Sequence, residues 1–100
     1  MAKKTNDLPI DFSTRFEKQL RECTREVQIA FQDALDIFLE NPTDSTLRDH
    51  QLERKLAEYR SINVTRDYRA LYKKKTEGKR KIIKFYMIGT HYQLYRNAPK

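Results

Sequence analysis

Cysteine, glycine and long apolar runs are scarce in this sequence, and each shortage excludes a class of protein. The single cysteine, Cys23, cannot form an intramolecular disulfide. It falls on an apolar helical stripe, where a small buried hydrophobe is expected. The only glycines, Gly78 and Gly89, are too few and too far apart for a phosphate-binding loop. The two histidines and one cysteine have no metal-ligand spacing, so neither a metal nor another cofactor is expected.

No apolar run is long enough to span a membrane or to serve as a signal peptide. We therefore expect no membrane association and a cytoplasmic location. The 100 residues are 38% hydrophobic and 35% charged, with only three prolines, which is typical of a compact globular chain. A single domain over residues 1–100 is expected.

Acidic charge is scarce in the second half of the chain. Residues 1–47 carry 6 Lys and Arg against 9 Asp and Glu, whereas residues 48–100 carry 15 against 5. The formal charge is thus −3 in the first part and +10 in the second, or +7 overall. Such a positive field favours nucleic acid or an acidic protein segment as a partner, although a merely solvated basic surface gives the same totals.

Residues 59–72 have the pattern of two antiparallel strands. Polar and apolar residues alternate over 59–65, as in a half-buried strand. Residues that favour strands continue over 68–72. Arg66-Asp67 between these runs leaves room only for a tight turn, so the sequence predicts a β-hairpin here.

Residues 82–88 form the most hydrophobic run of the chain and are expected to be the central strand. The charged segment before this run is expected to form a second hairpin turn at residues 76–79. Gly89-Thr90 is expected to break the strand, which leaves His91 and Tyr95 on a short tail past its end. Strand ends often carry functional side chains.

Residues 14–41 have apolar positions at steps of three and four, which is the stripe of an amphipathic helix. Thr14 and Glu17 have the spacing of a capping box, and Asn41-Pro42 ends the pattern. Nothing within the stripe is a strong helix breaker. The pattern by itself therefore favours one long helix.

Two short segments flank this helical region. Leu8, Ile10 and Phe12 alternate with Pro9 and Asp11 as in a short strand, and Pro9 would confine that strand to a sheet edge. Residues 42–58 form a polar connector that is long enough to lay a side chain across the sheet.

The only two histidines are His50 in the connector and His91 in the tail. Their imidazoles titrate near neutral pH, so they are the simplest acid and base pair that a nuclease could use. A surface or structural role is the alternative for each, and the spacing does not decide between the two. Basic residues interleaved with aromatic rings over residues 59–86 could bind phosphates and stack on bases. The alternative is that most of these rings are core and that the lysines only keep a hairpin tip soluble.

Short motifs follow the helical half in a fixed order: Leu47-Arg48-Asp49-His50, Tyr59-Arg60-Ser61-Ile62, Asp67-Tyr68-Arg69, Leu71-Tyr72, and Gly89-Thr90-His91 with Leu94-Tyr95. In this order they resemble the RelE/ParE toxin superfamily, and its YafQ-like branch in particular. The resemblance implies an α+β fold with two N-terminal helices packed on one face of a twisted antiparallel sheet of three to four strands. It also implies a turn between the helices near residues 21–24, in place of the single helix that the stripe favours.

The resemblance further implies the toxin of a bacterial type II toxin–antitoxin system, a ribosome-dependent endoribonuclease that cleaves mRNA in the A site. The expected partners are mRNA on the ribosome and a cognate acidic antitoxin, in a hetero-oligomer. The nucleophile is the 2′-hydroxyl of the RNA, so no metal is needed, and the product ends in a cyclic phosphate or 3′-phosphate. Such chemistry requires a base, an acid and a cation at the phosphate.

Carried over residue by residue, the resemblance makes His50 the general base and His91 the general acid. Tyr95 helps to hold the substrate, and Asp67 assists or orients a histidine. Asn63 departs from the family, whose active members often carry a histidine or arginine at this position, facing the phosphate. The expected RNA contacts are Arg60, Arg66, Arg69, Lys73 and Lys81.

The five catalytic candidates, His50, Asn63, Asp67, His91 and Tyr95, are expected to converge on one concave basic face of the sheet. Two other functions stay open: a non-catalytic ParE-like toxin that acts on a protein such as DNA gyrase, and a degenerate RNA-binding member of the superfamily. The presence of both His50 and His91 favours the nuclease over the gyrase type. Asn63 keeps the degenerate member open.

Overall fold

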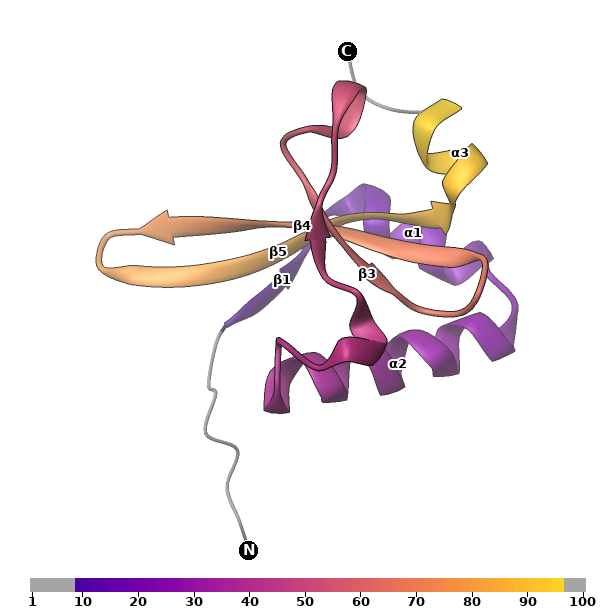
Figure 1. The fold of residues 1–100 in the computed structure, drawn as a ribbon, viewed down its shortest axis with the longest axis horizontal. Helices are drawn as coiled ribbons and strands as arrows, with labels where there is room; N and C mark the ends of the chain where they lie inside the picture. Colours follow the sequence, from indigo (N-terminus) through magenta and orange to yellow (C-terminus); the bar gives the residue numbers. More distant parts are fainter. Residues whose placement is uncertain (1–8, 97–100) are drawn as a thin grey trace, which may run out of the picture.

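A computed structural model of the chain describes residues 9–96, which form a five-stranded sheet with helices on both of its faces (Figure 1). The strands lie in the order β1-β5-β4-β3-β2. Neighbouring strands are antiparallel except β1 and β5, which are parallel. The strands are β1 (Ile10–Phe12), β2 (His50–Gln51), β3 (Arg60–Asn63), β4 (Tyr68–Glu77) and β5 (Arg80–Thr90), the helices are α1 (Thr14–Glu22), α2 (Arg25–Glu40) and α3 (His91–Arg96), and the short 3-10 turns are η1 (Ser45–Leu47) and η2 (Arg54–Leu56).

The α+β class is confirmed, and the expected sheet is corrected. It has five strands instead of three to four, and it is mixed instead of antiparallel. The extra strand, β2, comes from the connector, and β1 is the edge strand that Pro9 predicts. Leu8, with which the predicted alternation begins, lies outside the described residues. The alternation in a three-residue strand carries no information on which distant strand it joins or in which direction. Within residues 9–96, no helix is long and apolar enough to cross a membrane.

The apolar stripe is divided between two helices, as the resemblance implied and the stripe alone did not. Cys23 has extended backbone, and the Thr24 side chain caps α2 by accepting a hydrogen bond from a first-turn amide. The side-chain amide of Gln28 donates to the carbonyl oxygens of Leu20 and Cys23, at 3.0 and 3.2 Å. The end of α1 is thereby satisfied without continuing the helix.

The capping box expected at Thr14 and Glu17 is wrong by one residue. The N-cap of α1 is Ser13, whose Oγ accepts a hydrogen bond from the amide of Phe16 at 3.0 Å. Ser13 Oγ also donates to the carbonyl oxygen of Tyr86 at 3.1 Å. The first residue of the helix is therefore determined by a tertiary contact, the bond between Ser13 and β5, and not by the local capping pattern.

Strands β4 and β5 extend well beyond the rest of the sheet as a two-stranded arm (Figure 1). The turn expected at residues 76–79 is correctly located, but it consists of Gly78 and Lys79 alone. Gly78 has φ +63°, which suits a glycine at the first position of a two-residue hairpin loop. The run of charges does not interrupt the strands, because exposed side chains on both faces of the arm remain in water.

The strand break expected at Gly89-Thr90 is wrong. Both residues belong to β5, where they pair with Arg69 and Tyr68. Gly89 is instead a site of close approach, because a Cβ there would lie 3.0 Å from Oε1 of Gln93. That same oxygen accepts a hydrogen bond from the amide of Thr90 at 2.9 Å. The expected tail is helix α3, folded directly against the end of β5.

Two apolar clusters hold the sheet between its covering elements. The larger lies beneath α1 and α2 and is centred on Phe85, whose ring centroid is 5.4–6.2 Å from those of five other aromatic residues, Phe12, Phe16, Phe31, Phe38 and Tyr72. The smaller lies on the opposite face, where Leu71 and Met87 pack with Leu56 of η2 and Leu94 of α3. Burial of Leu94 therefore fixes α3, and with it His91, on the face that α1 and α2 leave open.

Candidate active site

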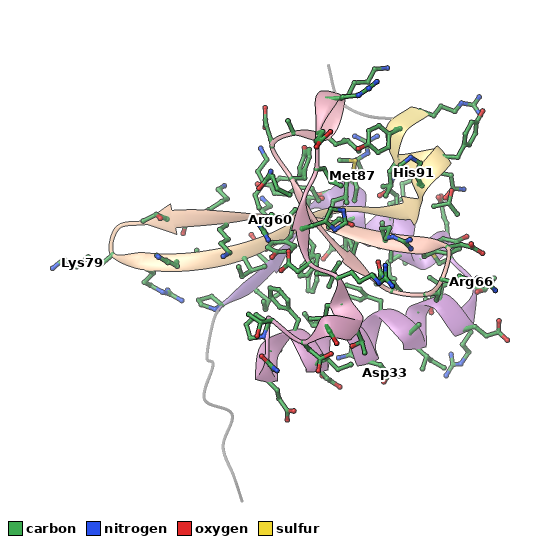
Figure 2. The ribbon with its side chains drawn as sticks, in the orientation of Figure 1. Asp33, Arg60, Arg66, Lys79, Met87 and His91 are labelled. Carbon is green, nitrogen blue, oxygen red and sulfur yellow. The ribbon has the colours of Figure 1, made fainter. Side chains whose placement is uncertain are left out.

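A pocket of about 300 Å³ on this open face is lined by both histidines of the chain. Its walls come from β2, β3, β4 and α3, which are distant in the sequence. Figure 2 shows His91 at the end of the molecule opposite to the arm, far from Lys79 at the tip of the arm. The lining residues are His50, Gln51, Leu52, Glu53, Ser61, Arg69, Leu71, His91, Leu94 and Tyr95.

His50 reaches the pocket from the edge strand β2. It pairs with Ser61 in the β2–β3 ladder, so the two side chains lie on the same face of the sheet. The Nδ1 atom of His50 lies 2.7 Å from the carbonyl oxygen of Arg48. A carbonyl oxygen only accepts hydrogen bonds, so Nδ1 carries the proton of the neutral ring and Nε2 is left as an acceptor. This arrangement suits a group that removes a proton.

His91 and Tyr95 reach the pocket from successive turns of α3. Residues four apart lie on one face of a helix, and here the ring centroids are 4.6 Å apart with the planes at 36°. The hydroxyl of Tyr95 also donates to the backbone carbonyl oxygen of Glu53, at 3.5 Å. The helix that carries His91 is thereby joined to the connector that carries His50.

Arg69 brings a permanent positive charge to the pocket. Its Nη1 donates to three backbone carbonyl oxygens in and beside the turn between β3 and β4, at 2.9 to 3.2 Å. These bonds hold one side of the guanidinium in place. An arginine has five N–H donors, so others remain to bind an anion.

Two of the five expected catalytic residues do not line the pocket. Asn63 is the cross-strand partner of Arg69, so its side chain lies on the same face of the sheet as Arg69 and Ser61. It is not among the residues that line the pocket, and it also borders a hollow beside α2. Asp67 lies in the exposed turn between β3 and β4, where its amide donates to Oγ1 of Thr65 at 3.2 Å. The structure therefore places three of the five residues in the wall of the pocket and Asn63 beside Arg69 on the same face of the sheet, whereas Asp67 lies in the turn outside the pocket.

The five expected RNA contacts are spread over the molecule and do not form one patch. Arg69 lies in the pocket, whereas Arg60 lies on the opposite face and donates from Nε to Oδ1 of Asp49 at 2.9 Å. Arg66 and Lys81 are exposed, the first in the β3–β4 turn and the second on the arm. Figure 2 labels Arg60 near the middle of the sheet and Arg66 at the end away from the arm.

Lys73 lies where the arm leaves the sheet. Its Nζ donates to Oε1 of Glu58 at 2.6 Å and lies 5.0 and 5.3 Å from the ring centroids of Tyr59 and Tyr86. The hydrogen bond and the charge of Lys73 lower the pKa of Glu58, and the bond to Glu58 raises the pKa of Lys73. The two rings pack against Lys73 and against each other, which is the packing role that the alternative interpretation gave them.

Sequence reasoning missed Ser61 as a pocket residue. The residue is only 2% exposed although its side chain is polar, and it lies beside His50 in the ladder. The signal was its place on the polar face of the alternating run 59–65. Cys23 is half-buried at the edge of the larger cluster, and burial raises the pKa of its thiol. Among residues 9–96, no group of three or more His, Cys, Asp or Glu side chains could hold a metal ion.

Comparison with known sequences identifies one family. Residues 8–96 match the family described as bacterial toxin of type II toxin–antitoxin system, YafQ. No curated protein matches the chain.

Solved structures show the same fold. YafQ from E. coli strain BL21(DE3) superposes with a TM-score of 0.69 at 22% identity, over 88% of this chain and 98% of that chain. The toxin chain matched in the E. coli DinJ–YafQ toxin–antitoxin complex has a TM-score of 0.64 at 24% identity, over 88% and 97%. A YoeB/ParE toxin from Agrobacterium tumefaciens has a TM-score of 0.67 at 14% identity, over 85% and 100%. Each match covers nearly the whole of the related chain.

Proposed function

The chain belongs to the YafQ family of bacterial toxins from type II toxin–antitoxin systems, and from this we propose that it is a ribosome-dependent endoribonuclease that cleaves mRNA. The observation that supports the activity is that His50 and His91 line one pocket together with Arg69. A proton acceptor, a proton donor and a fixed cation are the groups that cleavage of RNA by its own 2′-hydroxyl requires.

In the proposed reaction, Nε2 of His50 removes the proton of the 2′-hydroxyl, and the 2′-oxygen forms a bond to phosphorus. The bond from phosphorus to the 5′-oxygen breaks, and charged His91 gives that oxygen a proton. The products are a 2′,3′-cyclic phosphate and a 5′-hydroxyl end. His50 finishes the step protonated and His91 neutral, so the two must exchange protons with water before the next turnover.

Arg69 takes the part of the phosphate-facing cation that Asn63 cannot supply. Asn63 carries no charge, whereas Arg69, its cross-strand partner on the same face of the sheet, lines the pocket and carries a permanent charge. Tyr95 lies against His91 and offers a ring on which a base can stack. A role for Asp67 in orienting a histidine stays a prediction from the resemblance.

We further propose that an acidic antitoxin binds and inhibits the chain. The relative from E. coli is known in a DinJ–YafQ toxin–antitoxin complex, and another fold relative in the RelBE2 complex from Mycobacterium tuberculosis. The +10 charge of residues 48–100 gives an acidic partner a favourable electrostatic field. The site of action is the cytoplasm, where ribosomes translate mRNA.

The experiment compares cleavage of one mRNA when it is free and when it is bound to translating ribosomes. The expected result is cleavage in the ribosomal A site, much weaker cleavage of free mRNA, and cyclic phosphate ends. If the mRNA stays intact in both forms while DNA gyrase is inhibited, the nuclease function is contradicted and a ParE-like function takes its place.

A further inference from the structure

The residue before the proposed base is held from the other face of the sheet. The carboxylate of Asp49 turns away from the pocket and lies in a separate hollow beside the end of α2. Its Oδ1 accepts a hydrogen bond from Nε of Arg60 at 2.9 Å, and its Oδ2 accepts one from the hydroxyl of Tyr72. Arg60 and Tyr72 are cross-strand partners on β3 and β4. The carboxylate is therefore attached to two strands at once.

This attachment is important because β2 is very short. It consists of His50 and Gln51 and has one neighbour, β3, since it lies at the edge of the sheet. Such a ladder is shorter than the strands usual in globular proteins, and it holds its residues weakly by itself. The bonds of Asp49 add two attachment points immediately before the ladder. They therefore restrict the backbone that leads into His50.

The same bonds lie next to the peptide group that carries the carbonyl oxygen of Arg48. Arg48 has φ 48° and ψ 45°, in the left-handed region that residues other than glycine rarely adopt. This conformation turns the chain between η1 and β2. Its carbonyl oxygen lies 2.7 Å from Nδ1 of His50. Asp49 is the residue between the two, so fixing Asp49 keeps the carbonyl and the imidazole ring together.

The attachment persists over the pH range in which histidines titrate. Tyr72 is buried, and its burial and the neighbouring Asp49 raise the pKa of its hydroxyl well above the usual range. The hydroxyl therefore stays protonated and keeps donating to Asp49. Ring contacts with Phe38 and Phe85, at centroid distances of 5.2 and 5.5 Å, hold Tyr72 in place.

We propose, on the basis of the function proposed above, that Asp49, held by Arg60 and Tyr72, is a positioning residue for His50. It keeps the carbonyl oxygen of Arg48 bound to the N–H of Nδ1, so that Nε2 is the ring nitrogen presented to the 2′-hydroxyl. When the bonds of Asp49 are lost, the ring can rotate or adopt its other tautomer. Either change removes the basic nitrogen from the pocket.

Two variants and one matched control test this role. Asp49→Asn removes the charge without changing the shape, and Tyr72→Phe removes one hydrogen bond but keeps the buried ring. The control, Asp44→Asn, makes the same exchange in the same connector, where Asp44 caps η1 through bonds of 2.9 and 2.6 Å to Thr46 and has no bond to Asp49 or His50. Circular dichroism establishes that each variant is folded. Tyr72→Phe carries the test if Asp49→Asn does not fold.

Two readouts are needed. Two-bond ¹⁵N–¹H spectra of the imidazoles report the tautomer of His50 without any substrate, and a His91→Gln variant assigns the signals. Cleavage of mRNA on ribosomes gives kcat and KM as functions of pH. The charged and titratable groups that line the same pocket are Glu53, Arg69, His91 and Tyr95. All four are present in every variant except the assignment variant, so differences in the profile arise from His50.

The wild type and Asp44→Asn are expected to hold His50 with its proton on Nδ1. Asp49→Asn is expected to show a mixture of tautomers, a kcat lower by on the order of 10- to 100-fold, an altered pH profile and a KM within about twofold of the wild type. Tyr72→Phe should change all of these in the same direction and by less.

The positioning role is overturned if both Asp49→Asn and Tyr72→Phe keep the wild-type tautomer and the wild-type kcat. It is overturned as well if the tautomer changes while kcat does not. If the tautomer changes as expected and no protein cleaves RNA, the wild type included, the effect of Asp49 on the His50 ring stands and the proposed nuclease function fails.

Discussion

The hydroxyl of Tyr95 on α3 donates a hydrogen bond to the carbonyl oxygen of Glu53, 3.5 Å away, and so joins the two segments that carry the histidines. His50 lies three residues before Glu53, and His91 lies one helical turn before Tyr95. Tyr95 also packs against the apolar cluster that contains Leu56, Met87 and Leu94. The pocket therefore depends on the same apolar cluster that fixes α3, and the expected effects of substitution separate into chemistry, charge and packing.

Arg69→Ala should lower cleavage strongly, because Arg69 brings the fixed positive charge to the pocket. Loss of one donor aimed at transition-state charge typically costs about 10²- to 10³-fold in kcat. The kcat of Arg69→Lys should lie between those of the wild type and Arg69→Ala, because lysine keeps the charge but lacks the second set of N–H donors. Single-turnover cleavage on ribosomes measures both, with Lys18→Gln on α1 as a control for lost charge. A kcat of Arg69→Ala equal to that of the control would assign the phosphate cation to another residue.

Phe85→Ala should destabilise the fold most among single core substitutions. Phe85 is fully buried and its ring contacts five other aromatic rings. Removing such a side chain typically lowers the free energy of unfolding by about 3–5 kcal/mol, because a cavity remains. Urea denaturation measures the loss, and Phe85→Leu should lose clearly less. A loss below about 1 kcal/mol for Phe85→Ala would mean that this cluster is not the main core.

Alkaline pH should destabilise the wild type through Tyr72. In the unfolded chain a tyrosine ionises near about pH 10. Burial and the Asp49 carboxylate raise the pKa of Tyr72 in the folded state. Its contribution to stability is therefore complete below about pH 10 and is lost as the pH rises from there toward the folded pKa. The unfolding free energy, measured by urea titration below and above this pH, should fall less steeply with rising pH for Tyr72→Phe than for the wild type. Equal slopes for the two proteins would contradict the raised pKa of Tyr72.

Binding to ribosomes should weaken steeply as salt rises, because residues 48–100 carry a net charge of +10. Lys81 is exposed on the arm, so Lys81→Gln should reduce the slope of log affinity against log salt by about one if it contacts a phosphate. Sedimentation with ribosomes over a range of salt concentrations measures both slopes. An affinity of the wild type that does not change with salt would point to an apolar protein partner.

Local patterns predicted the strands of the second half well. The alternation over residues 59–65 and the short run of β-branched and aromatic residues at 82–88 are both strand signals that tertiary contacts did not override. The same kind of pattern failed in the helical half, where the apolar stripe continues across Cys23 and Thr24. The break there depends on the Gln28 side chain, which satisfies the last carbonyl groups of α1. Only the resemblance to the RelE/ParE superfamily predicted this turn.

The sequence identified several residues of the candidate site but not the strand and the ladder that position them. His50, His91 and Tyr95 were identified from motifs, and the pocket contains all three. The strand β2 was missed because two residues are too few for a periodic signal, and so the partnership of His50 with Ser61 was missed as well. The positions of the basic residues depend on strand length and pairing, which the sequence pattern did not give. The length of β4 and β5 places Lys81 on the arm, and the β3–β4 ladder directs Arg60 to the opposite face of the sheet.

The most direct test of the nuclease function is the pH dependence of mRNA cleavage on translating ribosomes by the wild type, His50→Ala and His91→Ala. The wild type should give a bell-shaped profile, because one histidine must be neutral and the other charged. Each alanine variant should lose about 10²- to 10⁴-fold in kcat, lose one limb of the bell and keep its affinity for ribosomes. Wild-type rates in both alanine variants would contradict the assignment of base and acid, and so would the absence of cleavage by all three proteins.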